Sequence, residues 1–165
     1  MVTINIAYTA PINPAGAEPT LSQPQIWAGL ERKVRRAQDF VPIIVACDVI
    51  SEEQTAKGLT VTREVKFKGA GPKGDGSAVK EICTHHAPSR VDFEQDNGSI
   101  ISNIVSKGPD GELLMTYAFE WLHPHVAEGS EEVEKLEAEH WTTAKMAVQG
   151  SIDTIRNLVK NGTIS

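Results

Sequence analysis

Apolar residues recur every three or four positions through the last long segment of the chain, from Ser130 to Asn161. At about 100° per residue they form one stripe along a helix, which a single carboxylate interrupts. The members of this stripe are Val133, Glu137, Trp141, Ala144, Val148, Ile152, Ile155 and Val159. Ser130 suits the N-cap, and Lys160 followed by Gly162 suits the C-terminal end. The pattern therefore predicts a C-terminal helix about 45 Å long, at about 1.5 Å per residue.

Alternation of apolar and polar residues, which is typical of strands, governs most of the chain before that helix. It predicts one strand near the N-terminus and a succession of further strands between Phe40 and His125. The predicted strands are approximately 2–8, 43–51, 58–68, 78–87, 89–95, 99–106 and 112–122. The pairs Asn97-Gly98 and Asp110-Gly111 stand between consecutive strands, as expected for hairpin turns. An antiparallel meander follows from this order.

One more helical pattern lies between the first and second strands. After a loop at 10–20, Ser22 can cap a helix whose apolar face is Ile26, Trp27, Leu30 and Val34. The basic run at 31–36 is expected largely on the opposite, solvated face, and 37–42 is expected as a turn or a second short helix. The sequence therefore predicts an α+β fold, in which a curved antiparallel sheet of about seven strands wraps around the long C-terminal helix.

Composition limits the class of protein. The 165 residues suit a single domain, 1–165, and the formal charge of −6 argues against nucleic acid or an anionic membrane as the main partner. No apolar run approaches the length of about 20 residues needed for a membrane span. The N-terminus lacks the pattern of a secretory signal, so we expect a cytoplasmic protein. Cys47 and Cys83 are then expected to be buried thiols rather than a disulfide.

Metal and nucleotide sites are not indicated. His85 and His86 alternate faces on a strand, His123 and His125 flank a proline in a turn, and no cysteine pair has the spacing of a zinc site. The GxGxxG match at 69–74 is followed by a strand instead of a helix, so we expect a flexible hairpin loop with no phosphate role. No metal and no cofactor are therefore expected.

One cation falls on an otherwise apolar strand face. Arg63 alternates in phase with Leu59, Val61, Val65 and Phe67. A buried guanidinium keeps its charge, so it needs a carboxylate, carbonyl groups, water or an anionic ligand. Glu81 and Glu137 are the candidate ion-pair partners, and a ligand contact is compatible with either. Hydropathy leaves open which face of 78–87 points inward, and it leaves the same question open for Asn103.

The last strand and the C-terminal helix supply the other candidate groups. Tyr117, Phe119 and Trp121 share one strand face, which is expected to be core or the wall of a ligand pocket. On the helix, His140 lies at the edge of the inward stripe, close to Glu137. An imidazole titrates near neutral pH and suits proton transfer. A histidine bonded only to solvent or backbone would give the same pattern.

The order of elements resembles the START-like (SRPBCC) helix-grip superfamily. Several short segments are similar to one branch of it, which contains uncharacterised bacterial and fungal proteins and fungal polyketide cyclases that close 2-pyrone rings. These segments are Ile26-Trp27-Ala28-Gly29-Leu30, Phe40-Val41-Pro42, Thr62-Arg63-Glu64-Val65 and Gly111-Glu112-Leu113-Leu114-Met115-Thr116-Tyr117. The superfamily also contains hydrolases, lipid carriers and hormone receptors, so the fold alone does not set the function.

The resemblance implies a cyclase that closes a 2-pyrone ring on a small hydrophobic polyketide-like chain. The expected catalytic groups are Arg63 for the carbonyl oxygen, His140 as general base, and Glu81. The expected substrate-binding residues are Asn103, Tyr117, Phe119, Trp121, Glu137, Trp141 and Ala144. Two alternatives stay open, namely a non-catalytic carrier of a hydrophobic carboxylate or lipid, and an interaction protein with a filled core. A homodimer is compatible with the sequence.

Overall fold

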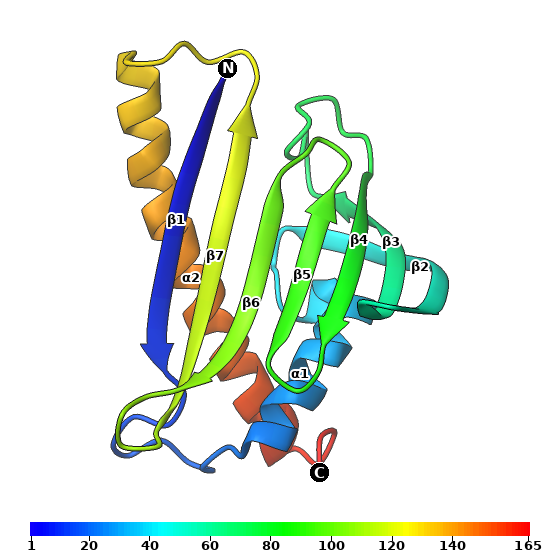
Figure 1. Cartoon of the computed structure of the whole chain (residues 1–165), viewed down its shortest axis with the longest axis vertical. Coiled ribbons are helices and arrows are strands. Elements are labelled where there is room, and N and C mark those ends of the chain that lie inside the picture. Colours follow the sequence, from blue (N-terminus) through cyan, green and yellow to red (C-terminus); the bar gives the residue numbers. More distant parts are fainter.

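The computed structural model describes residues 1–165 and consists of one antiparallel sheet with helices packed against one face (Figure 1). The seven strands lie in the order β1-β7-β6-β5-β4-β3-β2, so the first and second strands form the two edges. The strands are β1 (Val2–Pro11), β2 (Ile44–Thr55), β3 (Gly58–Phe67), β4 (Val79–His86), β5 (Arg90–Gln95), β6 (Ile100–Lys107) and β7 (Leu113–His123). The helices are α1 (Gln23–Arg35), the short 3-10 helix η1 (Ala37–Asp39) and α2 (Glu131–Lys160). The predicted α+β helix-grip arrangement is confirmed.

Two strands run further than the sequence predicts. β1 continues to Pro11 because it pairs with β7 along its whole length, up to the partner Leu114. β2 continues to Thr55, where a two-residue turn leads into β3 and Gly58 adopts φ +127°. The extra β2 residues are polar and exposed, so their hydropathy gave no strand signal.

The structure answers the question of which strand faces point inward. On β4 the inward-facing residues Val79, Glu81, Cys83 and His85 are buried, while Ile82 is exposed on the outer face. On β6, Asn103 is buried on the inner face. Glu81, His85 and Asn103 therefore lie on the inner face of the sheet, next to the apolar core. The cysteines are free thiols, Cys83 buried and Cys47 half-buried.

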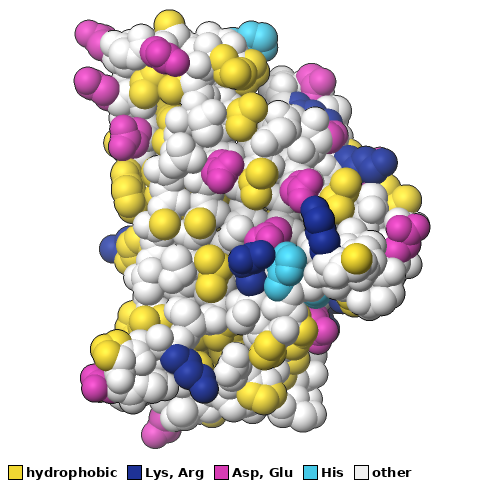
Figure 2. Space-filling model, in the orientation of Figure 1, with side chains coloured by type: hydrophobic (Ala, Val, Ile, Leu, Met, Phe, Trp, Pro, Cys, Tyr) yellow, Lys and Arg dark blue, Asp and Glu magenta, His cyan; other side chains and the backbone are white.

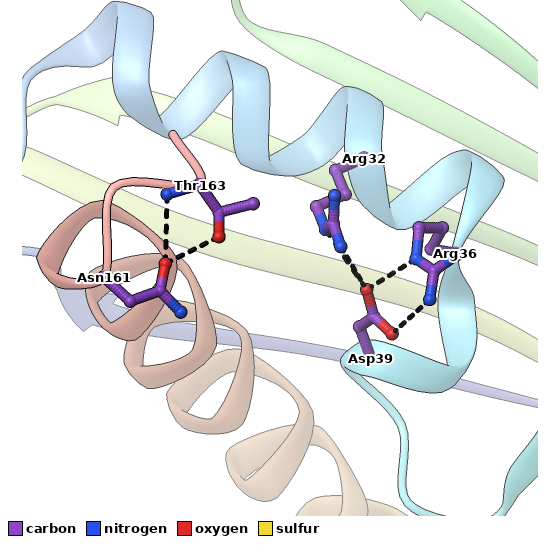
Figure 3. Close-up of polar contacts among 5 residues, drawn as sticks. All are labelled: Arg32, Arg36, Asp39, Asn161 and Thr163. Carbon is purple, nitrogen blue, oxygen red and sulfur yellow. Dashed lines mark hydrogen bonds and ion pairs between the residues drawn. The ribbon is translucent and has the colours of Figure 1, made fainter. Parts of the chain in front are cut away.

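Helix α1 begins as predicted and packs closely on α2. Ser22 and Gln25 form a reciprocal capping box, in which the Ser22 hydroxyl accepts from the Gln25 backbone N–H at 3.4 Å. Gly29 allows the close approach to α2, because a Cβ at this position would lie 2.4 Å from Cγ1 of Ile155. After the helix, Asp39 accepts hydrogen bonds from the guanidinium groups of Arg32 and Arg36 and fixes η1 (Figure 3).

Helix α2 packs mainly on β1 and β7, and only its C-terminal half is buried. Ala144, Val148 and Ile152 are almost inaccessible, whereas Trp141 is 45% exposed on the same stripe. The predicted stripe therefore ends as a buried surface at about Ala144. Ser130 occupies the N-cap position, but its hydroxyl donates to the Ala127 carbonyl and makes no capping bond.

The last residues close the end of α2 beside α1. The Asn161 side-chain oxygen accepts from the Thr163 backbone N–H at 3.0 Å and from its hydroxyl at 2.6 Å (Figure 3).

Acidic and basic side chains are interspersed over the face shown in Figure 2, which has no broad basic area. None of the helices combines the length and the hydrophobicity needed to cross a lipid bilayer.

Candidate functional site

The inner face of the sheet holds a buried ion pair between Arg63 on β3 and Glu81 on β4. The two residues are register partners, so their side chains leave neighbouring strands on the same face. Arg63 Nε and Nη2 lie 2.7 and 2.5 Å from Glu81 Oε2, and Gln95 Nε2 donates to Oε1 at 2.9 Å. Arg63 Nη1 donates to the carbonyls of Lys33 and Val34 at 2.8 and 2.7 Å. Of the five N–H donors of a guanidinium, one on Nη2 is left for another acceptor.

Lys33, from α1, lies next to this pair with its side chain inside the protein. Its Nζ donates to Asn103 Oδ1 at 3.0 Å and to the Tyr117 hydroxyl at 3.1 Å, and it lies 4.3 Å from the centre of the Tyr117 ring. Asn103 Nδ2 is buried without a hydrogen-bond partner. Burial raises the pKa of Tyr117 well above its usual value, so the phenol stays protonated. The structure thus brings Asn103 and Tyr117, two predicted ligand residues, together around a lysine.

His140, on α2, lies against the C-terminal end of β7, where it packs on aromatic rings. Its ring is 4.0 Å from that of Trp121, and its Nε2 is 2.8 Å from Nε2 of His123. Burial and the neighbouring His123 lower the pKa of His140. A neutral imidazole here can accept a proton, and the His123 contact requires that one of the two facing nitrogens carries the hydrogen.

Arg63 and His140 occupy different parts of the inner face. Strands β4, β5 and β6 separate β3 from β7, which corresponds to about 19 Å around the sheet at about 4.8 Å per strand. The strand register aligns Phe93, Ile101 and Phe119 in an apolar row between the two regions. Phe93 lies 5.1 Å from the Arg63 guanidinium, and Phe119 stacks on Trp121 at 4.3 Å. Arg63 and His140 therefore lie at the two ends of an apolar wall.

The remaining predicted ligand residues lie on α2. Ala144 is buried against the core, and Trp141 is half exposed. Glu137 is exposed and makes no ion pair with Arg63, so Glu81 is the partner among the two carboxylates that the sequence offered. Leu136, one residue earlier, packs on the core in its place.

A groove on the surface lies apart from these residues. It has a volume of about 610 Å³ and runs between α1, the β2–β3 turn and the β4–β5 turn. Trp27 and His85 lie in its wall, with ring centres 6.1 Å apart. His85 Nδ1 lies 2.9 Å from the Leu59 carbonyl, while Nε2 is buried and has no partner. Neither Arg63 nor His140 lines this groove.

The basic run at 31–36 is predicted to lie largely on a solvated face, and this is wrong for Lys33, which is only 8% exposed. Lys33 follows Ile26 by seven positions, which places both on the same side of a helix. Its phase therefore matched the apolar face, and only its charge suggested the surface. His85 was not selected either, because hydropathy did not reveal which face of its strand was buried.

Comparison with known proteins agrees with this fold. A protein of Aspergillus terreus (strain NIH 2624 / FGSC A1156), "Acetylaranotin biosynthesis cluster protein L", is 28% identical over 154 residues, which cover 93% of this chain and 88% of that protein.

Solved structures share the fold at low sequence identity. A START superfamily protein from Mycobacterium smegmatis superposes with a TM-score of 0.62 at 9% identity, covering 93% of this chain and 98% of that one. The Zhui aromatase/cyclase from Streptomyces sp. R1128 superposes with a TM-score of 0.63 at 13% identity, covering 96% of both chains. The chain spans about half the length of two di-domain aromatase/cyclases, 49% and 52%.

The family described as AtaL, "Acetylaranotin biosynthesis cluster protein L", matches residues 6–162. This match covers almost the whole domain, including β3, β7 and both helices that surround the buried polar groups. The chain belongs to the AtaL family and has the START-like helix-grip fold.

Proposed function

We propose that this protein is a polyketide cyclase, which closes a 2-pyrone ring on a linear poly-β-keto chain. The observation that carries the proposal is the buried polar group Arg63–Glu81–Lys33–Asn103–Tyr117 on the inner face of the sheet. A core needs no such group for stability, since buried charges are costly to desolvate. Membership of a family named for a biosynthetic cluster and the fold of solved aromatase/cyclases support the same conclusion.

Ring closure joins the δ-enol oxygen of the chain to its terminal carboxyl or thioester carbon. Negative charge develops on the attacked carbonyl oxygen, and a cation or N–H donor there lowers the barrier. Arg63 offers its remaining Nη2 hydrogen and its charge for this role, and Glu81 fixes the orientation of the guanidinium. The wall of Phe93, Phe119 and Trp121 would hold the chain in a folded conformation away from water.

His140 is the base that the sequence suggests. In the arrangement described above, His140 and Arg63 can act on one ring only if the N-terminal half of α2 moves toward β3. Trp141 in this half of the helix is 45% exposed, although Leu136 packs on the core and His140 contacts Trp121. Without such a movement His140 would contact only the outer end of a bound chain.

The proposal is tested by following the conversion of a linear 3,5-diketo thioester to its pyrone, against the uncatalysed reaction in buffer. Arg63→Lys should lower the rate by roughly 10²–10³-fold, the scale for one lost oxyanion donor, because an ammonium cannot reproduce the guanidinium fork. His140→Gln should lower it by about 10²–10⁴-fold if His140 is the base. His125→Gln is the matched control, since His125 is exposed, and it should leave the rate unchanged.

A carrier of a hydrophobic carboxylate is the second candidate. Most of the N–H donors of Arg63 already bond to groups inside the protein, which favours this candidate. A guanidinium fixed in this way is better suited to bind a ligand carboxylate than to adjust to a reacting oxygen. Wild-type turnover no faster than buffer, with retained binding of the diketo acid, would identify the carrier.

A further inference from the structure

Lys33 has fewer hydrogen-bond and ion-pair partners than Arg63, the other buried cation. The residue is 8% exposed, and no carboxylate lies within ion-pair distance of its amine. Glu81, the buried acid nearby, is held by Arg63 and Gln95. A buried ammonium without a counter-ion is unfavourable, so the site favours either the neutral amine or a bound anion.

The hydrogen bonds around Lys33 lead to the same conclusion. An ammonium has three N–H donors, and the protein offers two acceptors, Asn103 Oδ1 and the Tyr117 hydroxyl. One position on Nζ therefore remains for a lone pair or for a ligand. Beside it, the buried Nδ2 of Asn103 has no acceptor. An unpartnered donor next to an amine suits a ligand that carries an anionic or strongly polar oxygen.

Two charges face Lys33, Arg63 from β3 and Glu81 from β4, but burial is the main reason that this amine titrates near neutrality. Burial and, to a smaller degree, the Arg63 charge lower the pKa of Lys33 to about 7, while Glu81 acts in the opposite direction. Burial raises the pKa of Cys83 to about 12 and raises that of Tyr117, so both stay protonated. An amine of this kind is partly neutral at physiological pH and can both take and return a proton.

We propose that Lys33, in place of His140, is the base of the ring closure, acting on a 1,3-dicarbonyl ligand whose enolate oxygen it then holds together with Asn103. This inference rests on the proposed function. The Lys33 lone pair takes the enol proton and becomes the ammonium, and the freed electron pair on the enolate oxygen forms the bond to the thioester carbon. The carbon–sulfur bond breaks, and the departing thiolate takes the proton back from Lys33. No oxidant, reductant or further reactant is needed.

The test uses pentane-2,4-dione, a 1,3-diketone that cannot form a pyrone. Wild-type protein should bind it as the enolate, detected by ultraviolet difference spectroscopy as an enolate fraction well above that in buffer at the same pH. Lys33→Met should lose this excess, since methionine offers no amine to take the proton or to hold the enolate oxygen. Lys107→Met, at an exposed lysine, is the matched control and should retain it. Asn103→Leu should reduce the excess without abolishing it.

Circular dichroism establishes that each variant is folded, and Lys33→Met is expected to fold because it replaces a buried cation by an apolar chain. Folded wild-type protein with no enolate excess would overturn the inference. An excess that survives in Lys33→Met would overturn it too. A covalent adduct of the diketone on Lys33, seen by mass spectrometry, would also overturn it, because Lys33 would then be a nucleophile. Pyrone formation that persists in Lys33→Met would leave the cyclase standing and remove only the role of Lys33.

Discussion

Breaking the Arg63–Glu81 pair should be one of the most costly single changes in this protein. The two side chains are only 4% and 5% exposed, so neither charge can return to water when its partner is removed. Loss of one partner from a buried pair costs about 3–5 kcal/mol. In a domain of this size each kcal/mol lowers Tm by about 2–4 °C, which gives a decrease of about 6–20 °C for Arg63→Met or Glu81→Leu.

The two single variants are not expected to be equal. Arg63→Met leaves Glu81 with the hydrogen bond from Gln95 alone, whereas Glu81→Leu leaves Arg63 bonded to two backbone carbonyls. The first should therefore be the more destabilising of the two. It also removes the Arg63 charge that lowers the pKa of Lys33, so that pKa should rise.

The assay is urea unfolding of wild type, both single variants and the double variant. The double variant should recover most of the lost free energy, because an apolar pair leaves no unpaired charge. Arg35→Met is the control: the Arg35–Glu52 pair is 33% and 43% exposed, and its loss should cost less than about 1 kcal/mol. Additive losses in the double variant, or single losses no larger than that of Arg35→Met, would refute the reasoning.

Three further predictions concern stability. Gly29→Ala should destabilise by about 1–3 kcal/mol in urea unfolding, because its Cβ would overlap Ile155, and an unchanged midpoint would contradict the close helix contact. Ser22→Ala should cost about 1 kcal/mol, whereas Ser130→Ala should cost clearly less, since only Ser22 makes a capping bond. Because the pKa of Lys33 is lowered on folding to about 7, the unfolded chain binds more protons above that pH. Stability should therefore rise from about pH 7 to about pH 8.5, where unfolded thiols begin to ionise, with Lys33 contributing up to about 1.4 kcal/mol per pH unit. Lys33→Met should remove this contribution, and a slope that is the same in both proteins would contradict it.

The spacing of apolar residues and the Asn-Gly and Asp-Gly turns were sufficient to predict the fold. The alternation along strand 58–68 also predicted that Arg63 points inward. They could not choose its partner, because strand 78–87 carries polar groups on both faces. The choice of Glu81 comes from the β3–β4 register, which is a long-range property of the sheet. Helical phase extended the α2 stripe to Val133, but a periodic pattern does not show that full burial begins only at Ala144. The helical phase of Lys33, seven residues after Ile26, predicts a buried side chain, whereas its charge predicts an exposed one.

A crystal structure with a diketo acid analogue, blocked against enolisation at the δ-carbon, tests the central claim most directly. The claim is that the buried polar group on the inner face binds the ligand. We expect an oxygen of the analogue within hydrogen-bonding distance of Lys33 Nζ or Asn103 Nδ2, with its chain along Phe93 and Phe119. Binding only in the groove beside Trp27 and His85, with Lys33 still bonded to Asn103 and Tyr117 alone, would contradict the account.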